Sequence, residues 1–527
     1  MKNTIRSIVI AASVMLVVGA CTDPTVAPKS SVSSANIFSE EASYTAFLAK
    51  IYAGLATSGQ QGPAGNGDIS GLDEGFSQYM RLWWQMEELP TDEAAIAWND
   101  GPLQELNTQI WSSSNSFLGS MYYRIYFQVG LVNEFLRETT DAKLTERNVS
   151  AAMRANITKY RAEARFLRAY SYWHAMDLFG AVPVVTEADE VGKVPPAQKT
   201  RAEVYAYVVS ELTAIRNDLS AAGTGQYGRV DQGAVAMLLA KVYLNAQVYS
   251  GAAHYDLALA EAQKVIAGSY TLDNNFRRMF SADNNTSPEI IFAIQQDGDH
   301  IQTWGGMTFL VHAEVGASID AGAFGIDGGW WGLRTKSNIA ALYPNGGGPT
   351  SPDKRSAFFT TNGFSGNVTN LTDYTSGIGS PKYTNKTSAG VTGKNTTFVD
   401  TDFPVFRLAD AYLTYAEAVL RGGGGTRAQA LAYVNALRDR AYGNTTGQIT
   451  DAQLTTAFIL DERARELFWE GTRRTDLIRY GQFSTAGIWA WKGGVVGGKV
   501  TEAFRDLYPL PASELIANPK LKQNTGY

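Results

Sequence analysis

The sequence is poor in the residues that stabilise a fold or carry out catalysis without a large packed core. Cysteine occurs once in 527 residues, at Cys21, so no disulfide can form within the chain. Only four histidines are present, and no two of them have the spacing of zinc ligands. The formal net charge is −6 without any basic run, so the positive surface that nucleic acid requires is missing. Stability must come from a hydrophobic core, and nucleic-acid-binding proteins are excluded as a class.

Enzyme signatures are incomplete. Gly390–Lys394 lacks the first glycine and the Ser/Thr of a phosphate-binding loop. Asp297–His300 could hold a calcium ion, but it has neither the length nor the terminal glutamate of an EF-hand loop. The acidic residues of Glu87–Glu93 could supply a glycosidase pair, although nothing fixes their spacing across a sugar. We expect no catalytic residues, cofactor or metal, with an extracellular glycoside hydrolase as an alternative.

Long hydrophobic runs are scarce, and the one at the N-terminus is short. Lys2 and Arg6 precede the apolar run Ile8–Val18, which falls well below the roughly 20 residues of a membrane span. Small residues before Cys21 suit a signal peptidase. We predict a signal peptide over 1–20, lipidation at Cys21, and a lipidated tether over 21–38. Acyl chains on Cys21 would attach the protein to a membrane without spanning it.

Apolar residues recur at helical spacing through most of the remaining chain. The segments are Glu40–Leu55, Phe117–Arg137, Asn156–Phe179, Arg201–Leu219, Asp231–Tyr249, Tyr255–Ala267, Ala409–Arg421, Arg427–Ala441 and Ile459–Arg474. Small and apolar residues in Gly233–Tyr249 and Tyr255–Ala267 are typical of tetratricopeptide-like hairpins. The pattern predicts a mostly α fold: a tetratricopeptide-like helical-pair scaffold with a long irregular, loop-rich insertion carrying short β-strands.

The helical pattern is interrupted and later resumes. We predict a helical scaffold over 39–287 with a variable loop at 59–111, and a loop-rich ligand-binding insertion over 288–402, which includes a β-like segment at Ile290–Gln295. Helices return over 403–527. Because the chain leaves the scaffold and comes back, we expect one interwoven unit.

Five segments carry a family resemblance. The helix in Tyr160–Val185 begins Arg-Ala-Glu-Ala-Arg-Phe-Leu-Arg-Ala and ends Leu-Phe-Gly-x-Val-Pro. The other segments are Phe403–Asp410, with its Pro-x-x-Arg-x-Ala-Asp pattern, Asn435–Ala441, Ile459–Phe483 and Leu507–Tyr527. In this order, after a lipoprotein signal, they resemble the SusD/RagB family of outer-membrane nutrient-binding lipoproteins.

The resemblance implies a lipoprotein on the outer membrane, facing the cell exterior, that binds oligosaccharide. It implies a TonB-dependent transporter of the SusC type as the partner, with the lipoprotein as a lid over its mouth. A peptide-binding lipoprotein of the same family is an alternative, since the family includes members that serve peptide import.

Charged residues in two of these segments look complementary. Arg161, Arg165 and Arg168 form a basic face that needs acidic or carbonyl partners. The predicted helix Asp461–Arg474 is dense in glutamate and arginine. We expect its glutamates to pair with its own arginines and with the three arginines of the earlier helix, as structural ion pairs.

Tryptophans in loop-like surroundings are the candidate ligand contacts. A pyranose stacks its C–H face on an indole, and its hydroxyl groups bond to amides, guanidinium groups or carboxylates. The predicted ligand-binding residues are Trp83, Trp84 and Trp98, with the adjacent Arg81, Asn99 and Asp100, and Trp304, Trp330 and Trp331 in glycine-rich surroundings. Core packing is the alternative for any single tryptophan. A shallow exposed arc of indoles favours sugar over peptide, which would prefer an enclosed cavity.

Overall fold

The computed structural model describes residues 37, 38, 40–69 and 71–527. The predicted signal peptide and Cys21 lie outside the described residues and stay predictions. The chain forms two units, residues 1–44 and 45–527. In the first unit the described residues begin helix α3 (Glu41–Ala56), and the ring centroids of Phe38 and Tyr44 are 5.2 Å apart. The second unit holds the rest of the described structure.

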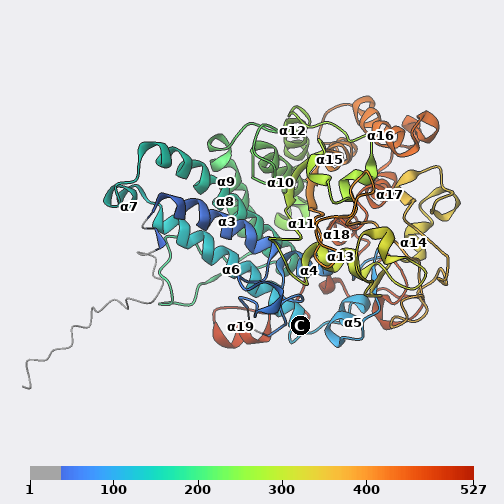
Figure 1. Ribbon diagram of the computed structural model, residues 1–527, viewed down its shortest axis with the longest axis horizontal. Coiled ribbons are helices and arrows are strands. Elements are labelled where there is room, and N and C mark those ends of the chain that lie inside the picture. The colour runs from blue at the N-terminus through green and yellow to red at the C-terminus, as the bar shows by residue number, and fades with distance from the viewer. Residues whose placement is uncertain (1–36, 39, 70) are drawn as a thin grey trace, which may run out of the picture. The chain divides into compact units, whose positions relative to one another are not determined.

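The fold is mostly helical, as predicted (Figure 1). The helices after α3 are α4 (Tyr79–Glu88), α5 (Gly101–Thr108), α6 (Ser116–Glu138), α7 (Asp141–Glu146), α8 (Ala151–Phe179), α9 (Arg201–Ile215), α10 (Gln232–Leu244), α11 (Ala246–Ser250), α12 (Tyr255–Ile266), α13 (Gly306–Ala313), α14 (Ser337–Ala340), α15 (Leu408–Leu420), α16 (Arg427–Tyr442), α17 (Thr456–Glu466), α18 (Arg473–Arg479) and α19 (Ala512–Ala517). No helix of the described part is long and apolar enough to cross a membrane.

The longer helices pack against one another in chain order, with short helices between some of them. Helix α6 packs on α8 and α8 on α9, while α10, α12, α15 and α16 pack in succession. Helix α8 ends at Gly180, which has φ +74°, and a Cβ there would come within 2.8 Å of the Leu507 side chain. Glycine therefore both ends this helix and lets the C-terminal segment pack closely against it.

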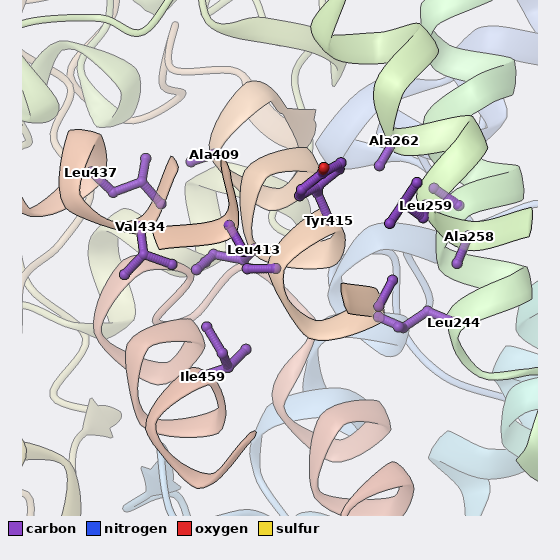
Figure 2. Packing of buried hydrophobic residues seen from close by; sticks show 14 of the residues in the cluster. Leu244, Ala258, Leu259, Ala262, Ala409, Leu413, Tyr415, Val434, Leu437 and Ile459 are labelled. Atoms are coloured by element: carbon purple, nitrogen blue, oxygen red, sulfur yellow. The ribbon is translucent and has the colours of Figure 1, made fainter. Parts of the chain in front are cut away.

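A hydrophobic cluster joins the helices on either side of the insertion. Figure 2 shows Leu244, Leu259 and Ala262 from α10 and α12 beside Leu413 and Tyr415 of α15. Val434, Leu437 and Ile459 extend the cluster to α16 and α17. The sequence between α12 and α15 is thus an excursion from one continuous core.

Short antiparallel ribbons organise that excursion. The strands are β1 (Ala95–Ile96), β2 (Val182–Pro183), β3 (Gln198–Lys199), β4 (Ile290–Ile294), β5 (Leu333–Arg334) and β6 (Phe403–Arg407). They pair as β1–β5, β2–β3 and β4–β6. The β4–β6 pair brings the start and end of the insertion together, and β1–β5 joins the insertion to the segment after α4.

A buried network of guanidinium groups and carboxylates holds α17 and the residues that follow it. Glu466 accepts from Arg407 at 2.6 Å and from Arg355 at 3.0 Å, and it also pairs with Arg440. Glu470 pairs with Arg407 at 2.6 Å and with Lys382 at 2.7 Å. Burial works to raise the pKa of Glu466, but the three arginines hold it well below its ordinary value. Charges from the insertion, β6, α16 and α17 therefore meet in one place.

The predicted partners of the arginines in α8 are wrong. Arg165 pairs with Glu211 of α9 at 2.7 Å, and Arg168 pairs with Glu211 at 2.8 Å and with Glu187. Arg161 donates to main-chain carbonyls near the end of α6. Helix α9 lies beside α8 and supplies the nearer carboxylate, while the acids of α17 are neutralised by other arginines.

The predicted continuous helix over 459–474 is also wrong. Helix α17 ends at Glu466, and Trp469 and Gly471 have φ of +58° and +68°. The N–H groups of these two residues donate to the side chains of Glu93 (2.9 Å) and Glu88 (2.7 Å). Side-chain carboxylates thus bind N–H groups that a continuing helix would have used.

We predict that Glu466→Gln strongly destabilises the protein, because it leaves Arg355, Arg407 and Arg440 short of one negative charge. Removing one partner of a buried ion pair costs about 3–5 kcal/mol. The urea-unfolding midpoint measures this loss. The matched change Glu190→Gln removes an exposed pair with Lys193 and should leave the midpoint unchanged. Equal midpoints for the two variants would contradict a stabilising role for the network.

Candidate functional site

The β1–β5 ribbon brings two of the predicted tryptophans together. Ala95 and Ile96 pair with Arg334 and Leu333, and the ladder continues with a 2.8 Å bond from Ala97 N–H to Gly332 O. Just beyond, the indole Nε1 of Trp98 donates to the main-chain oxygen of Trp330 at 2.9 Å. Their ring centroids are 6.4 Å apart with planes at 42°. Strand pairing thus places two indoles side by side from distant parts of the sequence.

Trp304 joins them from the turn before α13. The main-chain N–H of Trp304 donates to Glu74 Oε2 at 2.9 Å, and Arg81 Nη1 donates to the main-chain carbonyl of Trp304 at 3.3 Å. The Trp304 ring lies 6.1 Å from that of Trp330, with planes at 49°, and 4.9 Å from the ring of Phe398. Trp304 is 39% exposed. We call Trp98, Trp304 and Trp330 the indole cluster.

Helix α13 supports the indole cluster. The ring of Phe309 packs edge-on against Trp98 at 5.7 Å, and the ring of His312 stacks on Trp330 at 4.7 Å. The N–H of Trp330 donates to the carbonyl of His312 at 2.8 Å. The indoles are therefore held by packing and by main-chain bonds before any ligand arrives.

Polar side chains are exposed next to the cluster in sequence. Asn99 and Asp100 follow Trp98 directly, and Asp327 lies three residues before Trp330. All three are exposed, as is Asp73. Asp73 interacts electrostatically with Arg81, whose guanidinium lies 5.4 Å from the centroid of the Trp98 ring. The site thus combines flat apolar rings with carboxylates and an amide that can bond to hydroxyl groups.

Trp331 is exposed but lies outside the cluster. It is 52% exposed, and its ring lies 5.9 Å from that of Tyr374. Its φ of +54° is unusual for a bulky side chain. A Cβ on Gly316 would come within 2.7 Å of the Trp331 ring, so glycine is needed beneath it. Trp331 therefore offers an exposed aromatic surface beside Tyr374.

Trp83, Trp84 and Arg81 are not on the surface, which corrects their predicted exposure. All ten residues of α4 are buried, because α6, α13 and α18 pack around this helix. Trp84 Nε1 donates to Trp469 O at 3.0 Å. The Arg81 guanidinium lies 3.9 Å from the Phe76 ring, and burial lowers its pKa to about 9. Arg81 supports Trp304 from below and is itself shielded from solvent.

The acidic cluster at the end of α4 and just after it is also engaged inside the protein. Glu88 and Glu93 accept from main-chain N–H groups of the 469–472 segment, Asp92 pairs with Arg473 at 2.7 Å, and Glu87 contacts Arg474 at 3.3 Å. In the insertion, Asp297 pairs with Lys394 at 2.6 Å. No cluster of three or more potential metal ligands occurs in the described ranges.

Sequence reasoning missed the residues that hold the indoles. Glu74, His312 and Phe398 belong to no motif, and their contacts join segments far apart in the chain. Asp327 had a weak signal, since it lies in the same glycine-rich stretch as Trp330.

Two family models match the chain. One, described as "SusD family", matches residues 360–527, and another, described as "Starch-binding associating with outer membrane", matches residues 72–244. A curated relative, the starch-binding protein SusD of Bacteroides thetaiotaomicron, is 34% identical over 91% of both chains. SusD-like protein P25 of Formosa agariphila is 24% identical and covers 69% of this chain and 73% of its own length.

Solved structures share the fold. A SusD superfamily protein from Parabacteroides distasonis aligns with a TM-score of 0.70 at 21% identity, over 92% of this chain and 99% of its own. Surface glycan-binding protein A from Bacteroides thetaiotaomicron, in complex with laminarihexaose, aligns with a TM-score of 0.69 at 20% identity, over 91% and 98%. The identity to the starch-binding protein extends over nearly the whole chain, so this protein belongs to the SusD family.

Proposed function

We propose that this protein binds oligosaccharide through the indole cluster, with Asn99 and Asp100 bonding to sugar hydroxyl groups. The observation that supports it is the convergence of Trp98, Trp304 and Trp330 from three segments, with their rings partly exposed. A pyranose ring has an apolar face that stacks on such indoles. The family and the names of the relatives support a glycan ligand as well.

The angles between the rings favour a curved glycan. The planes of neighbouring indoles are tilted by 42° and 49°, so three successive sugar units stacked on them would follow a bend. An α-linked glucan chain curves in this way, whereas a straight glycan suits a flat array of rings. The ligand class we infer is a starch-type oligosaccharide, in line with the starch-binding relative. Trp331 would add a contact only for longer chains.

We further propose that the protein acts without catalysis, anchored in the outer membrane through Cys21 and facing the exterior. Its task would be to pass bound glycan to a TonB-dependent transporter of the SusC type. The buried and paired state of Glu88, Asp92 and Glu93 supports a binding role. The outer-membrane association named for the matching family supports this location.

We predict that Trp330→Ala weakens binding of maltohexaose at least tenfold, since it removes the central ring of the cluster. A tenfold loss corresponds to about 1.4 kcal/mol. Trp330→Phe keeps a flat ring and should retain part of the affinity. Isothermal titration calorimetry measures both, with thermal unfolding to confirm that each variant is folded. The exposed change Ile516→Ala on α19 is the control and should bind like the wild type. Unaltered affinity in Trp330→Ala would remove the cluster from the site.

A second prediction separates binding from hydrolysis. Prolonged incubation of the protein with starch and with laminarin should release no shorter saccharides in a chromatographic assay, because Glu88, Asp92 and Glu93 are engaged in bonds within the protein. Released products that disappear in a Glu93→Gln variant would establish the glycoside hydrolase instead.

The peptide-binding alternative has a different candidate surface. A cavity of about 410 Å³ lies between α3 and β4, lined mainly by apolar side chains that include Leu48, Phe292 and Ile294. It contains no tryptophan. Peptide binding that survives Trp330→Ala would point to this cavity and away from the sugar site.

A further inference from the structure

A buried histidine links the segments that carry the indole cluster. His312 is fully buried in the last turn of α13, and its ring is stacked on Trp330 with planes at 23°. Its carbonyl accepts from Trp330 N–H, so this one residue holds Trp330 through both its main chain and its side chain. Nothing in the sequence motifs marks His312 for such a role.

Both ring nitrogens of His312 face carbonyl oxygens. Nδ1 lies 2.6 Å from the oxygen of Gly328, and Nε2 lies 2.9 Å from the oxygen of Thr397. A carbonyl oxygen only accepts hydrogen bonds, and a neutral imidazole has a single N–H. Both contacts are hydrogen bonds only when the ring is protonated on both nitrogens. The arrangement of acceptors thus fits an imidazolium.

The two carbonyls belong to the two segments that position the exposed rings. Gly328 lies two residues before Trp330, and Thr397 directly precedes Phe398, whose ring packs on Trp304. The segments also bond to each other, through Asp327 N–H to the Thr396 oxygen at 3.1 Å and through Thr397 Oγ1 to the Asp327 carboxylate. The ring of His312 contacts a carbonyl of each segment on the side of α13.

We propose that His312 is a positioning residue for the glycan site: as an imidazolium it donates to Gly328 and Thr397 together and fixes the spacing of Trp330 and Trp304. This inference rests on the function proposed above. The neutral ring would lose one of these two hydrogen bonds, so the cluster would be held less firmly in its preformed geometry and bind glycan more weakly.

The surroundings of the ring set the pH at which this happens. Burial lowers the pKa of His312 below its ordinary value, while the two carbonyls and Asp327, with Oδ1 4.0 Å from Nδ1, oppose that effect. The stacked indole also favours the cation. On α13, Glu314 follows His312, but its carboxylate accepts from the N–H groups of Lys382 and Tyr383. Residues 395–398 contribute no charge. Both hydrogen bonds therefore form below this lowered pKa, and one of them is lost as the pH rises through it.

His174 provides a comparison within the same chain. It is also buried and stacked on an indole, with its ring 5.0 Å from that of Trp83. One nitrogen contacts the Tyr79 hydroxyl at 2.9 Å, while Nε2 has no hydrogen-bond partner in the described structure. Burial lowers its pKa to about 3. A buried histidine without two acceptors thus stays neutral where His312 is expected to become charged.

The first test needs no variant and no glycan. Nitrogen-15 spectra of histidine-labelled protein, titrated with acid, should show His312 protonated on both nitrogens at a clearly higher pH than His174. Indole fluorescence should change over the same pH range as the ring beneath Trp330 gains its charge. A single-tautomer neutral His312 down to the pH at which His174 titrates would overturn the proposal.

The second test asks whether the two hydrogen bonds of the His312 ring affect glycan binding. The wild type should bind maltohexaose several-fold more tightly at about pH 5 than at pH 7.5, within the range over which histidines titrate. His312→Gln, which keeps one donor nitrogen, should bind more weakly and lose this pH response, while His254→Gln, directly before α12, should behave as the wild type. A pH response that persists in His312→Gln would overturn the proposal. If Trp330→Ala leaves glycan affinity unaltered, the proposed function fails, and the histidine titration still decides the state of the ring.

Discussion

The buried ion-pair network around Glu466 is the constraint on which the rest of the structure depends. Arg407 comes from β6, Arg440 from α16, and Arg355 and Lys382 from the insertion, so the network joins segments that are far apart in the sequence. It continues through Trp469 and Gly471, whose N–H groups bond to Glu93 and Glu88 beside α4. From there β1 leads to Trp98. Buried charges in the helical frame thus help to position a partly exposed indole.

This arrangement explains why so many charged residues lie in a protein interior. A guanidinium group donates five hydrogen bonds in a fixed plane, so it can join two or three carboxylates from separate elements in one geometry. An irregular segment such as 288–402 cannot bury enough regular backbone to place itself by helix packing alone. Ion pairs with defined directions fix it where a nonspecific apolar contact would allow sliding.

The helices of the scaffold could be predicted from the sequence because their apolar period is a local property. Helix α6, for example, was expected at Phe117–Arg137 and spans Ser116–Glu138. The partners in ion pairs could not be predicted in the same way, because the local sequence around a glutamate does not determine which arginine it contacts. Trp84 and Trp98 illustrate the limit for the site. Each is followed directly by a polar residue, and only the packing around α4, whose residues are all buried, shows that Trp84 is inside. The contact between Trp98 and Trp330 spans 232 residues, and no local pattern encodes it.

The meeting of β4 and β6 has a consequence for how such proteins diversify. Because the excursion from the helical core leaves and re-enters through one small ribbon, its loops can be lengthened, shortened or replaced without moving either half of the core. The two buried cations Arg355 and Lys382 must be kept, because they bind the excursion to Glu466 and Glu470. Surface loops could be exchanged between relatives while the ribbon and these two cations are kept. Such chimeras would change the ligand preference on an unchanged helical core.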